Sequence, residues 1–161
     1  MKRFFQYFLL CGLVMTCVFP LGNVAYAKKK SGSKQERLVT YIQAYNGLYV
    51  SVKAQGKIAV DAKKVTKSEQ FEVIPLSGGY HAFKSKRNGK YLSVSRNGVV
   101  LATASKVGNN EKLIIHQHQD YHMSFKAKRN GKWLTAVGSG KREFIANKKS
   151  ISHHEKFEVQ Y

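Results

Sequence analysis

Cysteine, proline, tryptophan and acidic residues are all scarce in this chain. Of its 161 residues, two are cysteine, two are proline and one is tryptophan, and 9 Asp and Glu stand against 28 Lys and Arg. Both cysteines, Cys11 and Cys17, lie within the first 27 residues. The remainder of the chain therefore has no disulfide framework, no thiolate nucleophile and no cysteine metal site.

The first 27 residues have the pattern of a secretory signal peptide. Lys2 and Arg3 precede an apolar run over residues 4–18, and Ala25-Tyr26-Ala27 follows as a small-residue cleavage pattern. We expect cleavage near Ala27 and secretion to an extracellular or periplasmic location. The apolar run is short for a transmembrane helix, which favours a cleaved signal peptide, and an uncleaved anchor is the alternative. The mature form is expected to have no integral membrane span.

The mature chain, residues 28–161, is strongly basic. Removal of Lys2 and Arg3 leaves 26 of the 28 basic residues against 9 acidic ones, a formal charge of +17. A charge of this size attracts polyanions and exceeds the roughly 2 to 8 charges that keep a small domain soluble. Residues 28–36 are predicted to be a flexible basic arm, because they contain too little apolar material to fold.

The mature chain also repeats itself with a period of 42 residues. Asn-Gly occurs at Asn46-Gly47, Asn88-Gly89 and Asn130-Gly131, and four further columns follow the same spacing. Those columns are Tyr41, Phe83 and Phe125; Tyr49, Tyr91 and Trp133; Gly56, Gly98 and Gly140; and Ala62, Ala104 and Ala146. A fixed period of this length predicts three structural repeats, at about 37–77, 78–119 and 120–161, the third with two extra residues between Ala146 and Glu155.

Each repeat has the alternating hydrophobicity of β-strands. Leu92 and Val94 occupy one face of a predicted strand, and the matching residues of the first copy are Val50 and Val52. We therefore expect an all-β fold with almost no helix. Three four-stranded units in a chain too short for a propeller indicate a β-trefoil with pseudo-threefold symmetry, a closed form that protects its strand edges.

The repeated pattern NGKYLSV…EKL in residues 88–113, echoed as NGKWLTA…EKF in residues 130–157, resembles the fascin-like β-trefoils, with fibroblast growth factors as more distant relatives. The resemblance implies a β-trefoil fold, and we expect a monomeric binding module. Fascins bundle actin with several trefoils in tandem, whereas this chain has one. Trefoil lectins of the ricin type carry Gln-x-Trp, but Gly131 and Lys132 precede Trp133.

The pentapeptide Lys-Arg-Asn-Gly-Lys occurs twice, at residues 86–90 and 128–132. The Asn-Gly pair predicts a two-residue type I′ hairpin turn in every copy. The first copy has no cations in the matching turn, Ala44 to Leu48, so the charges are interpreted as serving a partner. We expect the hairpins to gather eight cations into one polyanion-binding patch, with a solvated rim as the alternative. The patch is Lys84, Lys86, Arg87, Lys90, Lys126, Lys128, Arg129 and Lys132.

Other candidate sites are weaker. Tyr91 and Trp133 could stack on sugars or bases beside the cations, or could instead fill the cap of the trefoil. The histidines at 116, 118 and 122 alternate, but the chain is expected to turn there, so we predict surface histidines with no metal and no cofactor. No nucleophile with a base and no carboxylate pair is recognisable, so no enzyme is expected.

These features predict a secreted module that binds an anionic polymer or surface, such as an acidic polysaccharide, an envelope glycopolymer, anionic lipid or extracellular nucleic acid. The alternative is a protein-binding module, either directed at actin or inhibitory toward a secreted enzyme.

Overall fold

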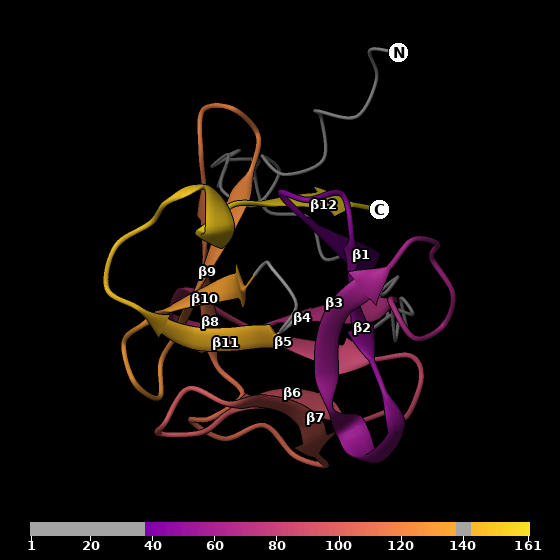
Figure 1. Cartoon of the computed structure of the whole chain (residues 1–161). Helices are drawn as coiled ribbons and strands as arrows, with labels where there is room; N and C mark the ends of the chain where they lie inside the picture. The colour runs from indigo at the N-terminus through magenta and orange to yellow at the C-terminus, as the bar shows by residue number, and fades with distance from the viewer. Residues whose placement is uncertain (1–37, 138–142) are drawn as a thin grey trace, which may run out of the picture. The chain divides into compact units, whose positions relative to one another are not determined.

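The computed structural model describes residues 38–137 and 143–161, whose regular structure consists of β-strands and three short 3-10 turns (Figure 1). The predicted signal peptide, 1–27, and the predicted arm, 28–36, lie outside the described residues. The strands are β1 (Val39–Ala44), β2 (Tyr49–Val52), β3 (Ile58–Ala62), β4 (Phe71–Pro75), β5 (Tyr80–Ser85), β6 (Tyr91–Val94), β7 (Val100–Ala104), β8 (Leu113–Gln117), β9 (Met123–Ala127), β10 (Trp133–Val137), β11 (Glu143–Lys148) and β12 (Phe157–Gln160). The 3-10 turns are η1 (Ala54–Gly56), η2 (Ser77–Gly79) and η3 (His153–Glu155).

Six of the strands close into a barrel. β1 pairs with β4 and β12, β5 pairs with β4 and β8, and β9 pairs with β8 and β12, all antiparallel. This ring leaves none of the six with an unpaired edge. The other six strands form the hairpins β2–β3, β6–β7 and β10–β11. A six-stranded barrel with three hairpins is a β-trefoil, and the predicted all-β class is confirmed.

The three hairpins share local geometry and contact one another. Each has a register shift directly after its aromatic residue, Tyr49, Tyr91 or Trp133. They meet through three bridging pairs at equivalent positions, Lys57 with Leu101, Val99 with Ile145, and Glu143 with Ala59. These pairs join each hairpin to the other two.

The core is filled by apolar residues that recur along the chain. Phe71, Leu113 and Phe157 are buried on alternate barrel strands, and Phe83 and Phe125 stack edge to face with ring centroids 5.4 Å apart. The strand residues predicted to face inward, Val50, Val52, Leu92, Val94, Leu134 and Ala136, are all buried. Burial of this apolar set supplies the main driving force for closing the barrel.

Two predicted columns are wrong. The column of Ala62, Ala104 and Ala146 fails in the third repeat, because Ala146 lies opposite Leu134 as Ala102 lies opposite Leu92. The two extra residues of the third repeat therefore precede β11, and the prediction that they lie between Ala146 and Glu155 is wrong.

The column of Tyr41, Phe83 and Phe125 fails in the first repeat. Ile42, and not Tyr41, is buried at the position that Phe83 and Phe125 occupy, and Tyr41 instead packs edge to face on Tyr49. The strand pairing agrees, because Thr40 lies opposite Phe71 as His81 lies opposite Leu113. β1 is therefore offset by 41 residues from β5, and the turn after it is one residue shorter.

At least four of the nine acidic side chains are turned inward: Glu69, Glu72, Glu111 and Glu155. Glu69 accepts hydrogen bonds from Ser51 Oγ (2.6 Å) and from the backbone and hydroxyl of Thr66 (both 2.7 Å). Because carboxylates are buried while lysines are exposed, the surface is more positive than the composition alone indicates.

Candidate functional site: two basic turns and a seam

The two Lys-Arg-Asn-Gly-Lys turns have the same backbone. Ser85 N donates to Lys90 O (2.8 Å) and Gly89 N donates to Ser85 O (2.9 Å), and Ala127, Lys132 and Gly131 repeat this pattern at 2.9 Å. Each loop thus contains four residues and not two. Gly89 and Gly131 both have φ of +68°, but the only non-glycine residues with positive φ in the described ranges are Gln55 and Tyr121. The predicted type I′ turn is wrong, although its glycine is required.

Asn88 and Asn130 fasten these turns to the neighbouring hairpins. Asn88 Oδ1 accepts from Lys90 N (3.0 Å), while its Nδ2 donates to Ala102 O on β7 (2.9 Å). Asn130 makes the equivalent bonds with Lys132 N (3.1 Å) and Ala146 O on β11 (2.9 Å). Each asparagine uses both its amide donor and its amide oxygen within the protein, so its role is to stabilise the fold.

The first turn lacks cations, but it also differs from the other two turns in length. Ala44 N donates to Leu48 O and Gly47 N donates to Ala44 O, both at 2.9 Å, so this loop has three residues. Asn46 Oδ1 accepts from Leu48 N (3.1 Å), as in the longer turns. The second and third turns differ from the first in both loop length and charge. The first turn therefore does not show by itself that the longer turns would form without their cations.

The eight predicted cations have different surroundings. Lys84 and Lys126 lie over the rings of Tyr91 (5.6 Å) and Trp133 (5.3 Å). Lys86 Nζ pairs with Glu72 (3.0 Å), whereas Lys128 Nζ lies 4.7 Å from the ring centroid of Tyr80. Arg87 Nη1 donates to Ser68 Oγ (2.8 Å). Within the described part of the chain, no ion pair or cation–π contact engages the other three, which are Lys90, Arg129 and Lys132.

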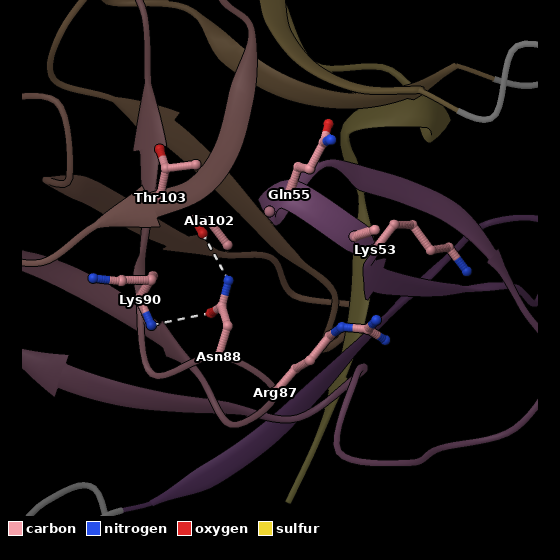
Figure 2. A pocket seen from close by; sticks show the side chains of 9 residues that line it. Lys53, Gln55, Arg87, Asn88, Lys90, Ala102 and Thr103 are labelled. Carbon is pink, nitrogen blue, oxygen red and sulfur yellow. Dashed lines mark hydrogen bonds between the residues drawn. The ribbon is translucent and has the colours of Figure 1, made fainter.

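Lys53, Arg87 and Lys90 lie together at one open depression, shown in Figure 2. Arg87 and Lys90 extend to opposite sides of Asn88, and Lys53 and Gln55 approach from the η1 turn of the preceding repeat. Lys53 Nζ is paired with Asp61 (2.7 Å), but no carboxylate lines the depression itself. The full lining is Lys53, Ala54, Gln55, Gly56, Arg87, Asn88, Lys90, Ala102 and Thr103.

A close backbone approach forms the floor of this depression. A Cβ on Gly56, where φ is +74°, would lie 2.5 Å from Ala102 O, the same carbonyl that Asn88 Nδ2 binds. Only glycine allows η1 to come this near. Sequence reasoning missed Lys53, Gln55 and Thr103 as neighbours of the basic turn. The repeated Gly56 and Gly98 column was the available signal, because a recurrent glycine marks close contact.

The predicted stacking residues are partly covered. Tyr91 and Trp133 are half-buried, and each has a lysine over its ring. The ring centroid of Trp133 also lies 6.1 Å from that of His116. Stacking of these rings on a ligand stays a prediction.

The histidine segment turns as expected. β8 ends at Gln117, and His118 N donates to His122 O (2.9 Å) across a turn in which Tyr121 has φ of +66°. Partial burial, aided by neighbouring His116, lowers the pKa of His118. A hydrogen bond from Lys156 holds the pKa of Asp120 at about 2. Among the described residues, no three side chains of the metal-binding type converge.

The recurrent glutamates accept hydrogen bonds that hold nearby loops of the fold. Ser152 donates to Glu155 through its N (2.8 Å) and Oγ (2.6 Å), and Gly108 N donates to Glu111 (2.7 Å). Burial acts to raise the pKa of Glu155, but hydrogen bonds from Ser152 and Thr135 outweigh it and hold that pKa below its usual range.

No helix in the described ranges is long and apolar enough to span a membrane.

Models of two protein families match the sequence, and each match covers more than half of the chain. The fascin domain matches residues 29–115. The chain belongs to the fascin domain family. The FRG1-like domain matches residues 78–161, so the two matches share residues 78–115 and together extend from 29 to 161. Both therefore describe parts of the same fascin-like β-trefoil. A search of curated protein sequences gave no match.

Solved structures agree on the fold. A designed threefold-symmetric protein, ThreeFoil, has a TM-score of 0.68 at 18% identity, over 75% of this chain and 96% of that one. The BEL β-trefoil has 0.67 at 13% identity, over 76% and 92%. A Polyporus squamosus lectin, bound to a Neu5Ac-containing epitope, has 0.66 at 16% identity, over 80% of this chain and 50% of the lectin. At these identities the likeness concerns the fold.

Proposed function

We propose that this fascin-like β-trefoil is secreted after cleavage near Ala27 and binds an anionic polymer, an acidic polysaccharide or envelope glycopolymer, through its basic turns. The observation that carries the proposal is the open depression of Figure 2, where Arg87, Lys90 and Lys53 meet without a lining carboxylate. Arginine presents a planar fork that suits carboxylate and sulfate groups, and lysine adds a point charge.

The polar lining fits a saccharide as well as an anion. Gln55 and Thr103 offer amide and hydroxyl groups on the side of the depression opposite the turn (Figure 2). Asn88 is already bonded to Ala102 O and Lys90 N, so it shapes the site and leaves recognition to its neighbours. The lectin among the similar structures supports saccharide binding by this fold, and its epitope contains an acidic sugar.

The inward-facing glutamates support an electrostatic mechanism. Glu69, Glu111 and Glu155 are buried and accept hydrogen bonds from backbone or hydroxyl groups, so they do not pair with the exposed lysines and arginines, whereas Glu72 pairs with Lys86. Binding to a polyanion then releases its counterions, and the logarithm of the affinity falls linearly with the logarithm of the salt concentration.

The proposal is tested with residues 28–161 on an array of neutral glycans, acidic glycans and nucleic acids at two salt concentrations. We expect acidic polysaccharides to bind best and to weaken steeply with salt. A variant with Arg87, Lys90, Arg129 and Lys132 changed to Ser should lose this binding. Its matched control changes four exposed lysines elsewhere to Ser: Lys63, Lys64, Lys67 and Lys106. Equal losses in both variants would refute the turns as the binding site.

A protein-binding module is the second candidate, because the chain matches the fascin domain. A mostly apolar protein interface loses little affinity when salt is raised, whereas a polyanion contact loses much. Binding to filamentous actin or to a secreted enzyme that is insensitive to salt, with no binding to acidic glycans, would favour this alternative.

A further inference from the structure

We infer that the third repeat carries a second anion-binding subsite, formed by Arg129 and Lys132 with Arg96, which is equivalent to the depression at Arg87 and Lys90. The inference rests on the proposed function and makes it more specific. It gives the protein two binding sites, adds Arg96 from outside the predicted patch, and requires a ligand that repeats its anionic groups along a polymer. Arg96 lies in the turn between β6 and β7, which matches the turn at Lys53 to Gly56 in the preceding hairpin.

We call the close contact between a hairpin turn of one repeat and the hairpin of the next repeat a seam: the first seam joins Gly56 to Ala102, and the second joins Gly98 to Ala146. The backbone of the second seam repeats that of the first. Gly98, with φ of +88°, approaches Ala146 O so closely that a Cβ there would collide with it, as a Cβ on Gly56 would collide with Ala102 O. Asn130 Nδ2 donates to Ala146 O at 2.9 Å, the length of the bond from Asn88 to Ala102 O. The Arg96 turn and the Arg129 turn therefore meet at one carbonyl.

The supporting hydrogen bonds of the two hairpin turns correspond as well. Gly98 N donates to Ser95 O (3.0 Å) and Ser95 N donates to Val99 O (2.9 Å). In the first seam Gly56 N donates to Lys53 O (3.3 Å) and Lys53 N donates to Lys57 O (2.7 Å). Arg96 thus stands where the first seam has Ala54, and it is exposed.

The charges of the second seam are less neutralised than those of the first. Lys53 is paired with Asp61 of β3 in the first seam, and the matching residue on β7 is Thr103, which has no charge. Within the described residues, Arg96, Arg129 and Lys132 make no ion pair. Three such cations beside one close backbone contact are suited to a sulfate or carboxylate group on a sugar.

Among the described residues, the turn of the first repeat lacks the cations that the other two turns carry. Its turn places Tyr45 and Leu48 at the positions of Arg87 and Lys90, and Tyr45 packs against His153 and His154 with centroids 5.0 and 4.4 Å apart. Two charged seams on one rigid module let a long polyanion bind both at once. Such linkage raises affinity by about 10²- to 10⁴-fold over a single site.

The experiment is an NMR titration of residues 28–161 with a sulfated heparin disaccharide, together with calorimetry on the same probe. We expect two equivalents to bind and the amide signals of Gly89 and Gly131 to shift. Arg87→Ser with Lys90→Ser should abolish the Gly89 response alone, and Arg96→Ser, Arg129→Ser and Lys132→Ser together should abolish the Gly131 response alone. Either variant should leave one equivalent and bind long heparin at least about tenfold more weakly.

The matched control changes exposed Lys63 and Lys64 to Ser and should retain both responses. One equivalent, with no shift at Gly131, would overturn the second subsite and leave the proposed function intact. Loss of both responses in the control would show that binding depends on the total charge and not on defined subsites, and this result would also overturn the second subsite. If neither the disaccharide nor long heparin binds the parent chain, and other acidic glycans fail too, the proposed function falls together with this inference.

Discussion

The two copies of Lys-Arg-Asn-Gly-Lys have identical sequences and equivalent backbones, yet their side chains meet different neighbours. Both turns close with the same hydrogen bonds, both glycines have φ of +68°, and both asparagines hold a carbonyl of the adjacent hairpin. Lys86, however, forms an ion pair with Glu72, while Lys128 lies over the ring of Tyr80.

The difference originates outside the pentapeptide. The residue 42 positions after Glu72 is Ile114, and the residue 42 positions after Ser68 is Asn110, so the third turn has neither the carboxylate nor the hydroxyl of the second. Local sequence thus determines the turn, whereas residues outside it determine the contacts of each cation: Ser68 and Glu72 at the second turn, and Tyr80 of β5 at the third. The comparison predicts which substitutions act equally in both copies and which do not.

The largest effect is expected at the glycine beneath the second seam. Gly98→Ala would bring a Cβ against Ala146 O at a backbone φ of +88°. Strain of about 1 to 3 kcal/mol from each cause, the positive φ and the overpacking, should sum to about 3 kcal/mol or more. Urea denaturation of the variant measures this loss.

Gly89→Ala is the matched control, because its φ is +68° but nothing lies within 4 Å of the added Cβ. Its cost should be only about 1 kcal/mol, from the positive φ alone. Equal losses for the two variants would contradict the close approach at the seam.

A buried carboxylate common to the repeats gives the next effect. Glu155→Gln removes the charged acceptor of two Ser152 hydrogen bonds and should cost about 1 to 3 kcal/mol at neutral pH. The folded-state pKa of Glu155 lies below its ordinary 4.5. Its stabilisation is therefore complete above that value and is lost as the pH falls through the folded-state pKa.

Urea denaturation at neutral pH and at about pH 3 should show the gap between parent and Glu155→Gln closing on acidification. A gap that is constant, or that widens in acid, would mean that the carboxyl is protonated in the folded protein.

The sequence was sufficient for the strands because the inward residues alternate and recur, as Leu92 and Val94 do. It was insufficient for the turns. Asn-Gly fits several hairpin loops, and only the pairing of Thr40 with Phe71 reveals that β1 is offset by one residue. Lys53 and Arg96 were missed as site residues because their neighbours belong to the next repeat, and contacts of that kind arise only when the barrel closes.

Asn88→Ala and Asn130→Ala should have nearly equal effects, since both asparagines make the same two bonds at 2.9 to 3.1 Å. Each substitution removes two net hydrogen bonds, and we expect a loss of about 1 to 2 kcal/mol in each variant. Thermal or urea unfolding of the two variants measures it. Losses that differ by more than about 1 kcal/mol would break the equivalence of the two turns.

The smallest effect separates the two copies most directly. Lys86→Met and Lys128→Met keep the aliphatic stem and remove the charge. Lys86 is 39% exposed and its partner Glu72 only 11%, so removing this ion pair should cost about 1 kcal/mol. Lys128→Met should cost about 0.5 kcal/mol, because an exposed cation–π contact is weak and Met still packs on Tyr80.

Raising the salt concentration should reduce the first loss more than the second, since the ion pair is screened. The measurement is urea unfolding of both variants at two salt concentrations. A larger loss for Lys128→Met would contradict the expectation that the ion pair of Lys86 stabilises the fold more than the cation–π contact of Lys128.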